Sequence, residues 1–256
     1  MIAVSAASGA LGRLVIAHLR TRAEVVAVVR DPGRAPEGVP VRRGDYDDPA
    51  SLREAFDGVD RLLLISSPEL DTARRIGQHL AAVAAAKDAG VGAVVFTSFL
   101  GADTAATGLT EAYHATERAV LGSGLPYTIL RHPFYGDPFV PRVSGGELTA
   151  STGGRGLNTA FRSDLAEAAA NVLTGEGHLG RAYDLTGPLW SHPEVAAALG
   201  VPYREVPDAG PGAMSWINAQ VRAGLLERQT PDLERVLGRP AETVVSRALE
   251  LHATPH

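Results

Sequence analysis

Cysteine is absent from this chain of 256 residues, and lysine is almost absent. Without cysteine the chain has no disulfide, thiolate nucleophile, Cys-bearing zinc site or iron–sulfur ligand. Only Lys87 among the 24 basic residues is a lysine, so any catalytic lysine would have to be this one. It ends an alanine-rich stretch just before Gly90, where a cation stabilises a helix C-terminus. The Gly-Lys-Ser/Thr sequence of a Walker A loop is also missing.

Long apolar runs and a basic surplus are missing as well. No uncharged apolar run approaches the roughly 18 to 20 residues of a membrane helix, and the first residues lack the basic stretch of a signal peptide. The net charge of -5 argues against a nucleic-acid binder, which needs concentrated positive charge. We therefore expect a cytoplasmic protein that binds neither membrane nor nucleic acid. No histidine pair has zinc-site spacing and no Gly-x-Ser-x-Gly elbow occurs, so we expect neither a metal site nor an α/β-hydrolase.

The composition that remains is globular, with 45% apolar and 21% charged residues. Short apolar runs alternate with helical stretches, a pattern typical of repeated βαβ units. Strands are predicted at 2–5, 24–29, 39–42, 61–65, 93–97, 127–130 and 182–185. Helices are predicted between them at 11–21, 49–56, 70–89, 110–123 and 162–173. The sequence therefore predicts an α/β fold with a Rossmann-type doubly wound parallel sheet.

The alternation decays after about residue 133. Loops rich in Gly and Pro follow, with shorter helices predicted at 192–199, 212–224, 230–237 and 241–252. We expect a single domain over 1–256, in which about 1–132 binds a dinucleotide and about 133–256 forms a small, mostly helical part for the substrate. The alanine-rich stretch 81–86 indicates a closely packed helix, against its own sheet or against another subunit, which leaves a homodimer open.

A dinucleotide fingerprint follows the first predicted strand and opens the first predicted helix. It consists of Ser5, Ala6, Ala7, Ser8, Gly9, Ala10, Leu11 and Gly12. Gly9 would let the backbone approach a pyrophosphate, Gly12 would let the helix pack closely on the strand, and the first amides of the helix would hold the phosphate charge. Ala6 replaces the first glycine of the pattern, which is tolerable at negative φ but strained at positive φ. A plain strand-to-helix turn is the alternative.

Two residues after the second strand indicate the choice of cofactor. Arg30 could hold the 2′-phosphate of NADP by charge-assisted hydrogen bonds, whereas Asp31 could hold the ribose hydroxyls of NAD. Because Arg30 comes first, we expect NADPH rather than NADH, the alternative being two solvated loop charges. Asp45 and Tyr46, after the third strand, are placed to flank the adenine, unless this acidic turn only caps the next helix.

Further motifs occur in order over about three quarters of the chain. They include Val-Arg-Asp-Pro at 29–32, Leu-Leu-Leu-Ile-Ser-Ser-Pro-Glu at 62–69, Val-Phe-Thr-Ser at 95–98, Tyr-Thr-Ile-Leu-Arg at 127–131 and Arg-Ser-Asp-Leu-Ala at 162–166. Together these motifs resemble the NmrA-like branch of the atypical short-chain dehydrogenases, most of all its NAD(P)H:quinone oxidoreductases. The resemblance implies an NAD(P)-binding site that includes Ser66, Ser67, Thr97 and Ser98.

The chain also departs from the pattern of that family. The family usually has Gly in the place of Ala6, His in the place of Tyr113 and Asn in the place of His132, and its C-terminal half is commonly longer. Since most of these departures fall near the expected substrate pocket, the resemblance bears more on the cofactor than on the substrate.

The chemistry expected of the site follows from the missing lysine. Ordinary short-chain dehydrogenases use Tyr-x-x-x-Lys, in which the lysine helps the tyrosine to protonate an alkoxide. Here Glu117 stands four residues after Tyr113, so this pair cannot work in that way. A quinone makes a smaller demand, because hydride transfer yields a delocalised hydroquinone anion that needs only a few hydrogen-bond donors.

The candidate catalytic donors are Tyr113, His132 and Tyr135, with Phe134 and Phe139 as apolar walls. Tyr113 could instead have a packing or surface role, and His132 could be a loop histidine bound to a backbone carbonyl. His132 and Tyr135 leave a strand end, where open α/β sheets bind their ligands.

The leading hypothesis is an NADPH-dependent reductase that transfers a hydride to a quinone or a quinone-like aromatic polyketide without a Tyr-Lys dyad. Two alternatives stay open. One is a non-catalytic redox sensor that binds a nicotinamide dinucleotide and then a regulatory partner, and the other is an atypical polyketide ketoreductase.

Overall fold

The computed structural model describes residues 1–104 and 106–253. The chain divides into two compact units. Unit 1 consists of Met1–His132 and Arg162–Leu185, and unit 2 consists of Pro133–Phe161 and the residues from Thr186 onward. Unit 1 thus includes one helix and one strand, within residues 162–185, that follow the boundary expected near residue 133. The assignment of cofactor and substrate to the two parts stays a prediction.

Unit 1 is built on a seven-stranded parallel sheet with the strand order β3-β2-β1-β4-β5-β6-β9. All seven strands were expected from the sequence: β1 Ile2–Val4, β2 Val25–Val29, β3 Val41–Arg43, β4 Arg61–Leu64, β5 Ala93–Phe99, β6 Tyr127–His132 and β9 Arg181–Asp184. Ile2 of β1 lies opposite Val25 of β2 on one side and opposite Arg61 of β4 on the other. The strand order therefore reverses at β1, which is where doubly wound sheets bind ligands beyond their carboxyl ends.

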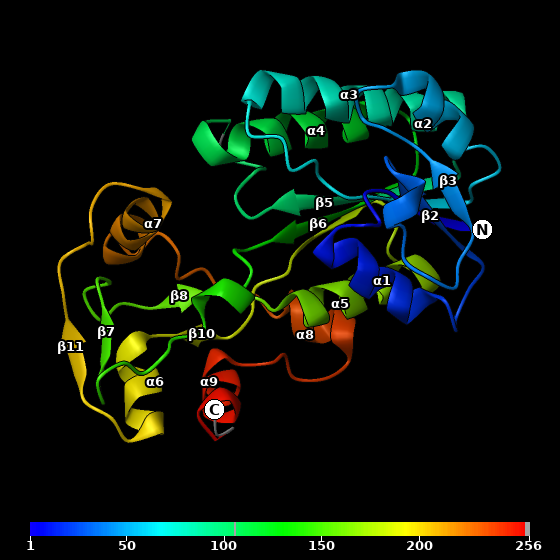
Figure 1. The fold of residues 1–256 in the computed structure, drawn as a ribbon. Coiled ribbons are helices and arrows are strands. Elements are labelled where there is room, and N and C mark those ends of the chain that lie inside the picture. The colour runs from blue at the N-terminus through cyan, green and yellow to red at the C-terminus, as the bar shows by residue number, and fades with distance from the viewer. Residues whose placement is uncertain (105, 254–256) are drawn as a thin grey trace. The chain divides into compact units, whose positions relative to one another are not determined.

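Helices cover both faces of this sheet (Figure 1). The helices α2 (Pro49–Ala55), α3 (Thr72–Asp88) and α4 (Glu111–Gly122) form one layer, and α1 (Ala10–Leu19) packs with α5 (Arg162–Thr174) in the other. A strand covered on both faces is apolar throughout, as in β2, whose sequence Val-Val-Ala-Val-Val is completely buried. The predicted Rossmann-type fold is confirmed.

The alanines of α3 lie against the core of unit 1. Ala82, Ala85 and Ala86 are buried in the same cluster as Leu62 and Phe96. Small side chains let the helix approach the sheet closely, so the burial of these alanines is explained within the chain itself, and a homodimer stays a prediction. Lys87 lies in the last turn of α3 as expected, and Gly90 follows with a φ of 69°.

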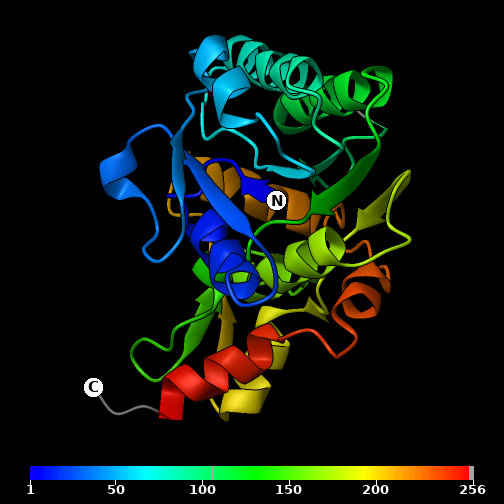
Figure 2. The ribbon, with the colours of Figure 1, turned by 90° about the vertical axis from the view of Figure 1, so that its right-hand side faces the viewer.

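In the described part of unit 2, four α-helices lie close to their predicted positions: α6 His192–Leu199, α7 Ala213–Arg222, α8 Asp232–Leu237 and α9 Val244–Ala253. Figure 2 shows α6 (yellow) beside α9 (red), and the two helices pack together. Four short strands were not predicted. Strand β7 (Leu148–Ala150) pairs with β11 (Tyr203–Glu205), and β8 (Leu157–Asn158) pairs with β10 (Leu189–Trp190). Strands of two or three residues are too short to show an alternating pattern, so the expectation of a mostly helical part was incomplete.

Within the described part of the chain, no helix is long and apolar enough to cross a membrane.

Candidate dinucleotide-binding and catalytic site

The predicted phosphate loop joins β1 to α1. Gly9 is the N-cap of α1, and no side chain of the described residues caps the start of the helix by a hydrogen bond. Gly9 and Ala10 are exposed, whereas Leu11 and Gly12 are buried. An uncapped helix N-terminus presents backbone N–H groups and the positive end of the helix dipole, which together suit a phosphate.

Ala6 and Gly12 fix the shape of this loop. The φ of Ala6 is 47°, the one positive φ of a non-glycine residue in the described ranges. The structure therefore decides between the two possibilities left by the sequence, because a left-handed alanine is strained. A Cβ on Gly12 would lie 2.7 Å from the Cα of Ala7, so Gly12 permits the close packing of helix on strand that we expected. A Cβ on Gly9 would lie 3.3 Å from the carbonyl oxygen of Ala6, which is a tight contact within the protein itself. The role of Gly9 in the approach of a pyrophosphate stays a prediction.

Arg30 and Asp31 differ in how they are used. Asp31 is the N-cap of a short 3-10 helix, η1 (Pro32–Arg34), and its Oδ1 accepts a hydrogen bond from the N–H of Gly33 at 3.0 Å. Arg30 is exposed, and its side chain forms no ion pair or hydrogen bond with the described residues. The acidic candidate is thus engaged in its own turn, and the basic candidate is free to bind an anion.

Ser5, Tyr46 and Ile65 form a closed ring of hydrogen bonds. The hydroxyl of Tyr46 donates to the carbonyl of Ile65 at 2.5 Å, and the N–H of Ile65 donates to Oγ of Ser5 at 2.8 Å. The hydroxyl of Ser5 completes the ring by donating to the oxygen of Tyr46 at 2.7 Å. Burial raises the pKa of Tyr46, so the phenol is neutral. Both predicted cofactor residues use their hydroxyls inside the fold. The contact of Tyr46 with an adenine stays a prediction.

Asp45 belongs to the turn before α2. Its Oδ1 accepts the N–H of Asp47 at 3.1 Å, and the cap of α2 is Asp48, whose Oδ1 accepts the N–H of Ser51. The alternative of an acidic turn that caps a helix is therefore realised by Asp48. The contact of Asp45 with an adenine stays a prediction.

The four hydroxyl residues implied by the family resemblance lie at the carboxyl edge of the sheet, after β4 and near the end of β5. The hydroxyl of Ser67 donates to Oε1 of Gln78 at 2.5 Å, and that of Ser98 donates to Oε1 of Glu117 at 2.5 Å. Oγ1 of Thr97 accepts the N–H of Ser66 at 3.0 Å. Ser67, Thr97 and Ser98 are buried, so these side chains shape the edge of the sheet.

Glu117 is engaged with Arg131 of β6. Two nitrogens of the guanidinium donate to the two carboxylate oxygens at 2.9 and 2.8 Å. Arg131 also pairs with Asp184 at 3.4 Å and with Asp103 at 3.3 Å. The pKa of Arg131 is raised chiefly by its hydrogen bond to Glu117. The carboxylate in the place of the usual lysine therefore serves a buried ion cluster.

Arg75 of α3 takes the position next to Tyr113, and our sequence analysis missed it. Its Nη2 donates to the phenol oxygen of Tyr113 and to Oγ of Ser66, at 2.7 Å in both cases. The ring of Tyr113 also packs against that of Phe99, with centroids 5.6 Å apart. An arginine in the first turn after a βα loop carries no specific signal, because only the fold brings α3 and α4 together.

His132 is buried and Tyr135 is half-buried. His132 ends β6 and is 3% exposed, and burial lowers its pKa to about 3. Its ring is therefore neutral near pH 7. Tyr135 belongs to unit 2, where its backbone forms a bridge with Ala160. The roles of Tyr113, His132 and Tyr135 as catalytic residues stay predictions.

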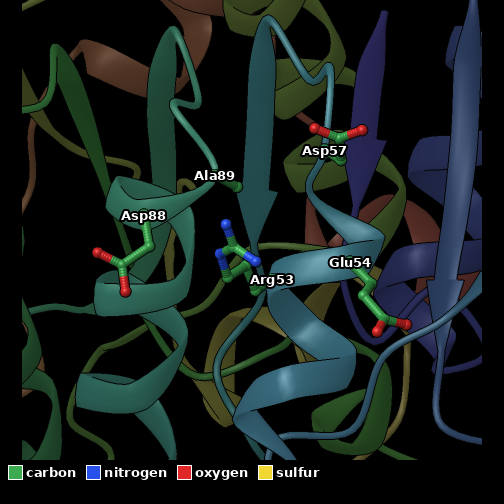
Figure 3. A pocket seen from close by; sticks show the side chains of 5 residues that line it. All are labelled: Arg53, Glu54, Asp57, Asp88 and Ala89. Atoms are coloured by element: carbon green, nitrogen blue, oxygen red, sulfur yellow. The ribbon is translucent and has the colours of Figure 1, made fainter.

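Two hollows in unit 1 are lined by none of the predicted site residues. One of about 290 Å³ is lined by Arg53, Glu54, Asp57, Asp88 and Ala89, and Figure 3 shows Arg53 between Asp88 and Glu54. It lies where α2 and α3 end, at the edge of the sheet where strands begin. The other, of about 480 Å³, runs along α1 beside the segment 33–37. In the described ranges no group of three or more histidines and carboxylates could hold a metal ion.

Three features together are typical of a dinucleotide-binding α/β protein. They are the reversal of strand order at β1, the uncapped helix after the glycine loop and, among the described residues, the unpaired Arg30 after β2. Comparison with known proteins narrows this class. Residues 6–176 match the profile of a family described as NAD(P)H-binding. The chain is 38% identical to quinone oxidoreductase 2 of Escherichia coli (strain K12) over 211 residues, which cover 78% of this chain and 73% of that protein.

Two further relatives cover almost the whole chain. The crystal structure of Citrobacter sp. triphenylmethane reductase complexed with NADP(H) gives a TM-score of 0.88 at 33% identity, with 96% of this chain and 99% of that chain covered. The NAD(P)H azoreductase of Xenophilus azovorans is 28% identical over 95% of both chains. This chain belongs to the NAD(P)H-binding, NmrA-like family. The predictions of family, nicotinamide cofactor and oxidoreductase class are confirmed.

Proposed function

We propose that this protein is an NADPH-dependent reductase of quinones and similar conjugated aromatic acceptors. The observation that carries the choice of cofactor is the contrast between Arg30 and Asp31. Asp31 already caps η1, whereas Arg30 is exposed and unpaired among the described residues. A guanidinium in this position suits the 2′-phosphate that distinguishes NADPH from NADH.

The residues of the phosphate loop fit such a cofactor. The uncapped N–H groups at the start of α1 would hold the pyrophosphate, and Arg30 would hold the 2′-phosphate. When bound, the reduced nicotinamide supplies a hydride. Ala6 has a strained φ of 47°, and strained backbone of this kind persists where the surrounding structure holds it and is common at ligand sites.

The class of acceptor rests on what the relatives have in common. Quinones, triphenylmethane dyes and azo compounds are conjugated, so the charge of the group that receives a hydride is spread or neutralised over an aromatic system. Such a product needs no strong positioned acid, which agrees with a site that has Glu117 in the place of the usual lysine. Aromatic polyketides with a quinone ring belong to the same chemical class.

The experiment that tests the cofactor assignment is a binding titration of Arg30→Ala with NADPH and NADH. One charged hydrogen bond contributes about 1.5 to 3 kcal/mol, so NADPH binding should weaken roughly 10- to 150-fold while NADH binding stays nearly unchanged. Arg20→Ala is the matched control, because Arg20 is an exposed arginine at the other end of α1. Equal losses for both cofactors would refute the assignment.

The acceptor is tested by NADPH oxidation with benzoquinones, naphthoquinones and polycyclic ketones. Turnover of the quinones supports the proposal. Binding of NADPH without oxidation by any acceptor would favour a redox sensor, and stereospecific formation of an alcohol from a polycyclic ketone would favour a ketoreductase.

A further inference from the structure

Tyr113 lies beside a cation, Arg75, that pairs with no carboxylate of the described residues. Arg75 donates to the phenol oxygen of Tyr113 and to Oγ of Ser66 at 2.7 Å each, and its guanidinium carbon lies 4.5 Å from the centroid of the Tyr113 ring. Within residues 1–104 and 106–253, Arg75 forms no ion pair. Its neighbour Arg74 differs, because Asp47 and Glu69 bind it at 2.8 and 3.4 Å.

The hydrogen bonds of Arg75 itself do not account for its place. Its Nε is buried and has no hydrogen-bond partner among the described residues. A buried donor without an acceptor is unfavourable and calls for an explanation. The charge of Arg75 also acts on His79. Burial is the larger cause and the positive charge of Arg75 the smaller one that together lower the pKa of His79 to about 3.

His79 forms hydrogen bonds with Ser66, Ser67 and Thr116, and the tautomer of its ring determines which of these groups donate. The hydroxyl of Thr116 donates to the carbonyl of Ala112 at 2.6 Å, so Nδ1 of His79 must be the donor in its 2.7 Å bond to Thr116. Nε2 of the neutral ring is then an acceptor, which receives the N–H of Ser67 at 2.8 Å and the hydroxyl of Ser66 at 3.2 Å. The oxygen of Ser66 is left to accept from Arg75.

This arrangement determines where the proton of Tyr113 points. The phenol oxygen uses a lone pair to accept from Arg75, so its O–H must be directed elsewhere. None of the described residues accepts a hydrogen bond from that O–H, and the side chain is partly exposed. The O–H of Tyr113 is therefore a donor available to a ligand at the carboxyl edge of the sheet.

We propose that Arg75 is the positioning residue of Tyr113: from α3 it provides the cation that a Tyr-x-x-x-Lys enzyme carries on the helix of the tyrosine, and it turns the phenol O–H toward the oxyanion of the acceptor. This inference rests on the proposed function. The quinone gains a hydride and becomes a hydroquinone anion, Tyr113 donates a hydrogen bond and keeps its proton, and solvent supplies the proton that completes the hydroquinone.

The first test compares kcat for quinone reduction in Arg75→Met, Arg75→Lys, Tyr113→Phe and the double variant Arg75→Met/Tyr113→Phe. Since Arg75 acts through one hydrogen bond of Tyr113, Arg75→Met and Tyr113→Phe should each lower kcat roughly threefold to twelvefold. The double variant should be no slower than Tyr113→Phe alone, because the two residues act as one unit. Arg75→Lys should recover most of the rate, and the dissociation constant of NADPH should not change.

The matched control is Arg74→Met, which removes an arginine from the same turn of α3 and should leave kcat nearly unchanged. The proposal is overturned if Arg75→Met is as active as Arg74→Met, or if the losses multiply in the double variant. A loss in Arg75→Met that Arg75→Lys does not rescue would also contradict it.

A second test needs no turnover and separates this inference from the proposed function. Isothermal titration calorimetry measures the binding of 4-nitrophenolate, an inert oxyanion of a phenol, at a pH where the phenol is ionised, with and without NADP⁺. Binding should weaken several-fold in Arg75→Met and in Tyr113→Phe but not in Arg74→Met. Equal binding by all variants, or no binding by the unsubstituted protein, would refute the inference, whereas absence of quinone turnover alongside the expected binding would refute only the proposed function.

Discussion

Two arginines lie in unit 1 near the carboxyl edge of the sheet, and their surroundings are opposite. Arg131 faces three carboxylates, those of Glu117, Asp184 and Asp103. Arg75 faces only the neutral oxygens of Ser66 and Tyr113, with one donor left unpaired among the described residues. A guanidinium that is fully matched by acids stabilises a fold, while one that is matched only by hydroxyls keeps its positive charge for a ligand.

The difference also explains the glutamate that replaces the usual lysine. Glu117 and Tyr113 are four residues apart on α4, yet Glu117 is 3% exposed and bound to Arg131, while Tyr113 is bound to Arg75. The position of the usual lysine thus belongs to an ion cluster, and in the arrangement that we propose the cation beside the tyrosine comes from another helix. Substitutions in the two clusters should therefore have separable effects on stability and on turnover.

The largest effect is expected for Arg131→Met. The substitution removes the guanidinium that binds the buried carboxylate of Glu117, and breaking a buried pair in this way costs about 3 to 5 kcal/mol in the free energy of unfolding. Denaturant unfolding measures the loss. Arg118→Met, an exposed arginine on the same helix as Glu117, is the control and should change the stability by less than about 0.5 kcal/mol. A loss as small as that of the control would mean that the cluster has no structural role.

Acid should produce the next largest effect, through the histidine that supports Arg75. The pKa of His79 is about 3 in the folded protein, below its ordinary value of 6.5, so between these values only the unfolded chain binds the proton. Stability that is fully present above pH 6.5 is therefore lost as the pH falls toward 3, by about 2 kcal/mol at pH 5. His132 adds a similar loss because its pKa is also about 3.

Unfolding of His79→Asn at several pH values checks this prediction. The variant should be less stable than the unsubstituted protein at pH 7 but should lose about 2 kcal/mol less between pH 7 and pH 5, because an amide does not titrate in this range. An unchanged slope would show that the pKa of His79 is the same in the folded protein and in the unfolded chain, and would contradict the prediction. The remaining slope belongs to His132 and to His192, whose pKa is lowered to about 4 by desolvation.

The smallest effect on stability is expected for Tyr113→Phe, which should nevertheless lower turnover measurably. Tyr113→Phe removes one hydroxyl that, among the described residues, is bound to Arg75 alone, and it should lower the free energy of unfolding by about 0.5 to 1.5 kcal/mol at most. In the same variant kcat/KM for a quinone should fall roughly threefold to twelvefold. A fall of three orders of magnitude would instead identify the phenol as an obligatory proton donor and favour the ketoreductase.

The sequence predicts the sheet of unit 1 because its signals are local. Each strand is a short apolar run, each helix between them has its own periodicity, and the fingerprint from Ser5 to Gly12 lies within a single turn. Lys87 at the end of α3 and Gly12 in the first turn of α1 could be interpreted for the same reason. The strands of two or three residues in unit 2 could not, because they exist only through their pairing with distant segments.

Strain and charge partners were decided by the tertiary structure. The sequence shows that Ala6 replaces a glycine, but only the path of the chain from β1 to α1 requires a φ of 47° there. It shows Glu117 four residues after Tyr113, but not that Arg131 from β6 binds the one and Arg75 from α3 binds the other. Residue order determines what lies within a few positions along the chain, whereas electrostatics acts over a few ångströms in space, and only the packing of helices on the sheet converts one into the other.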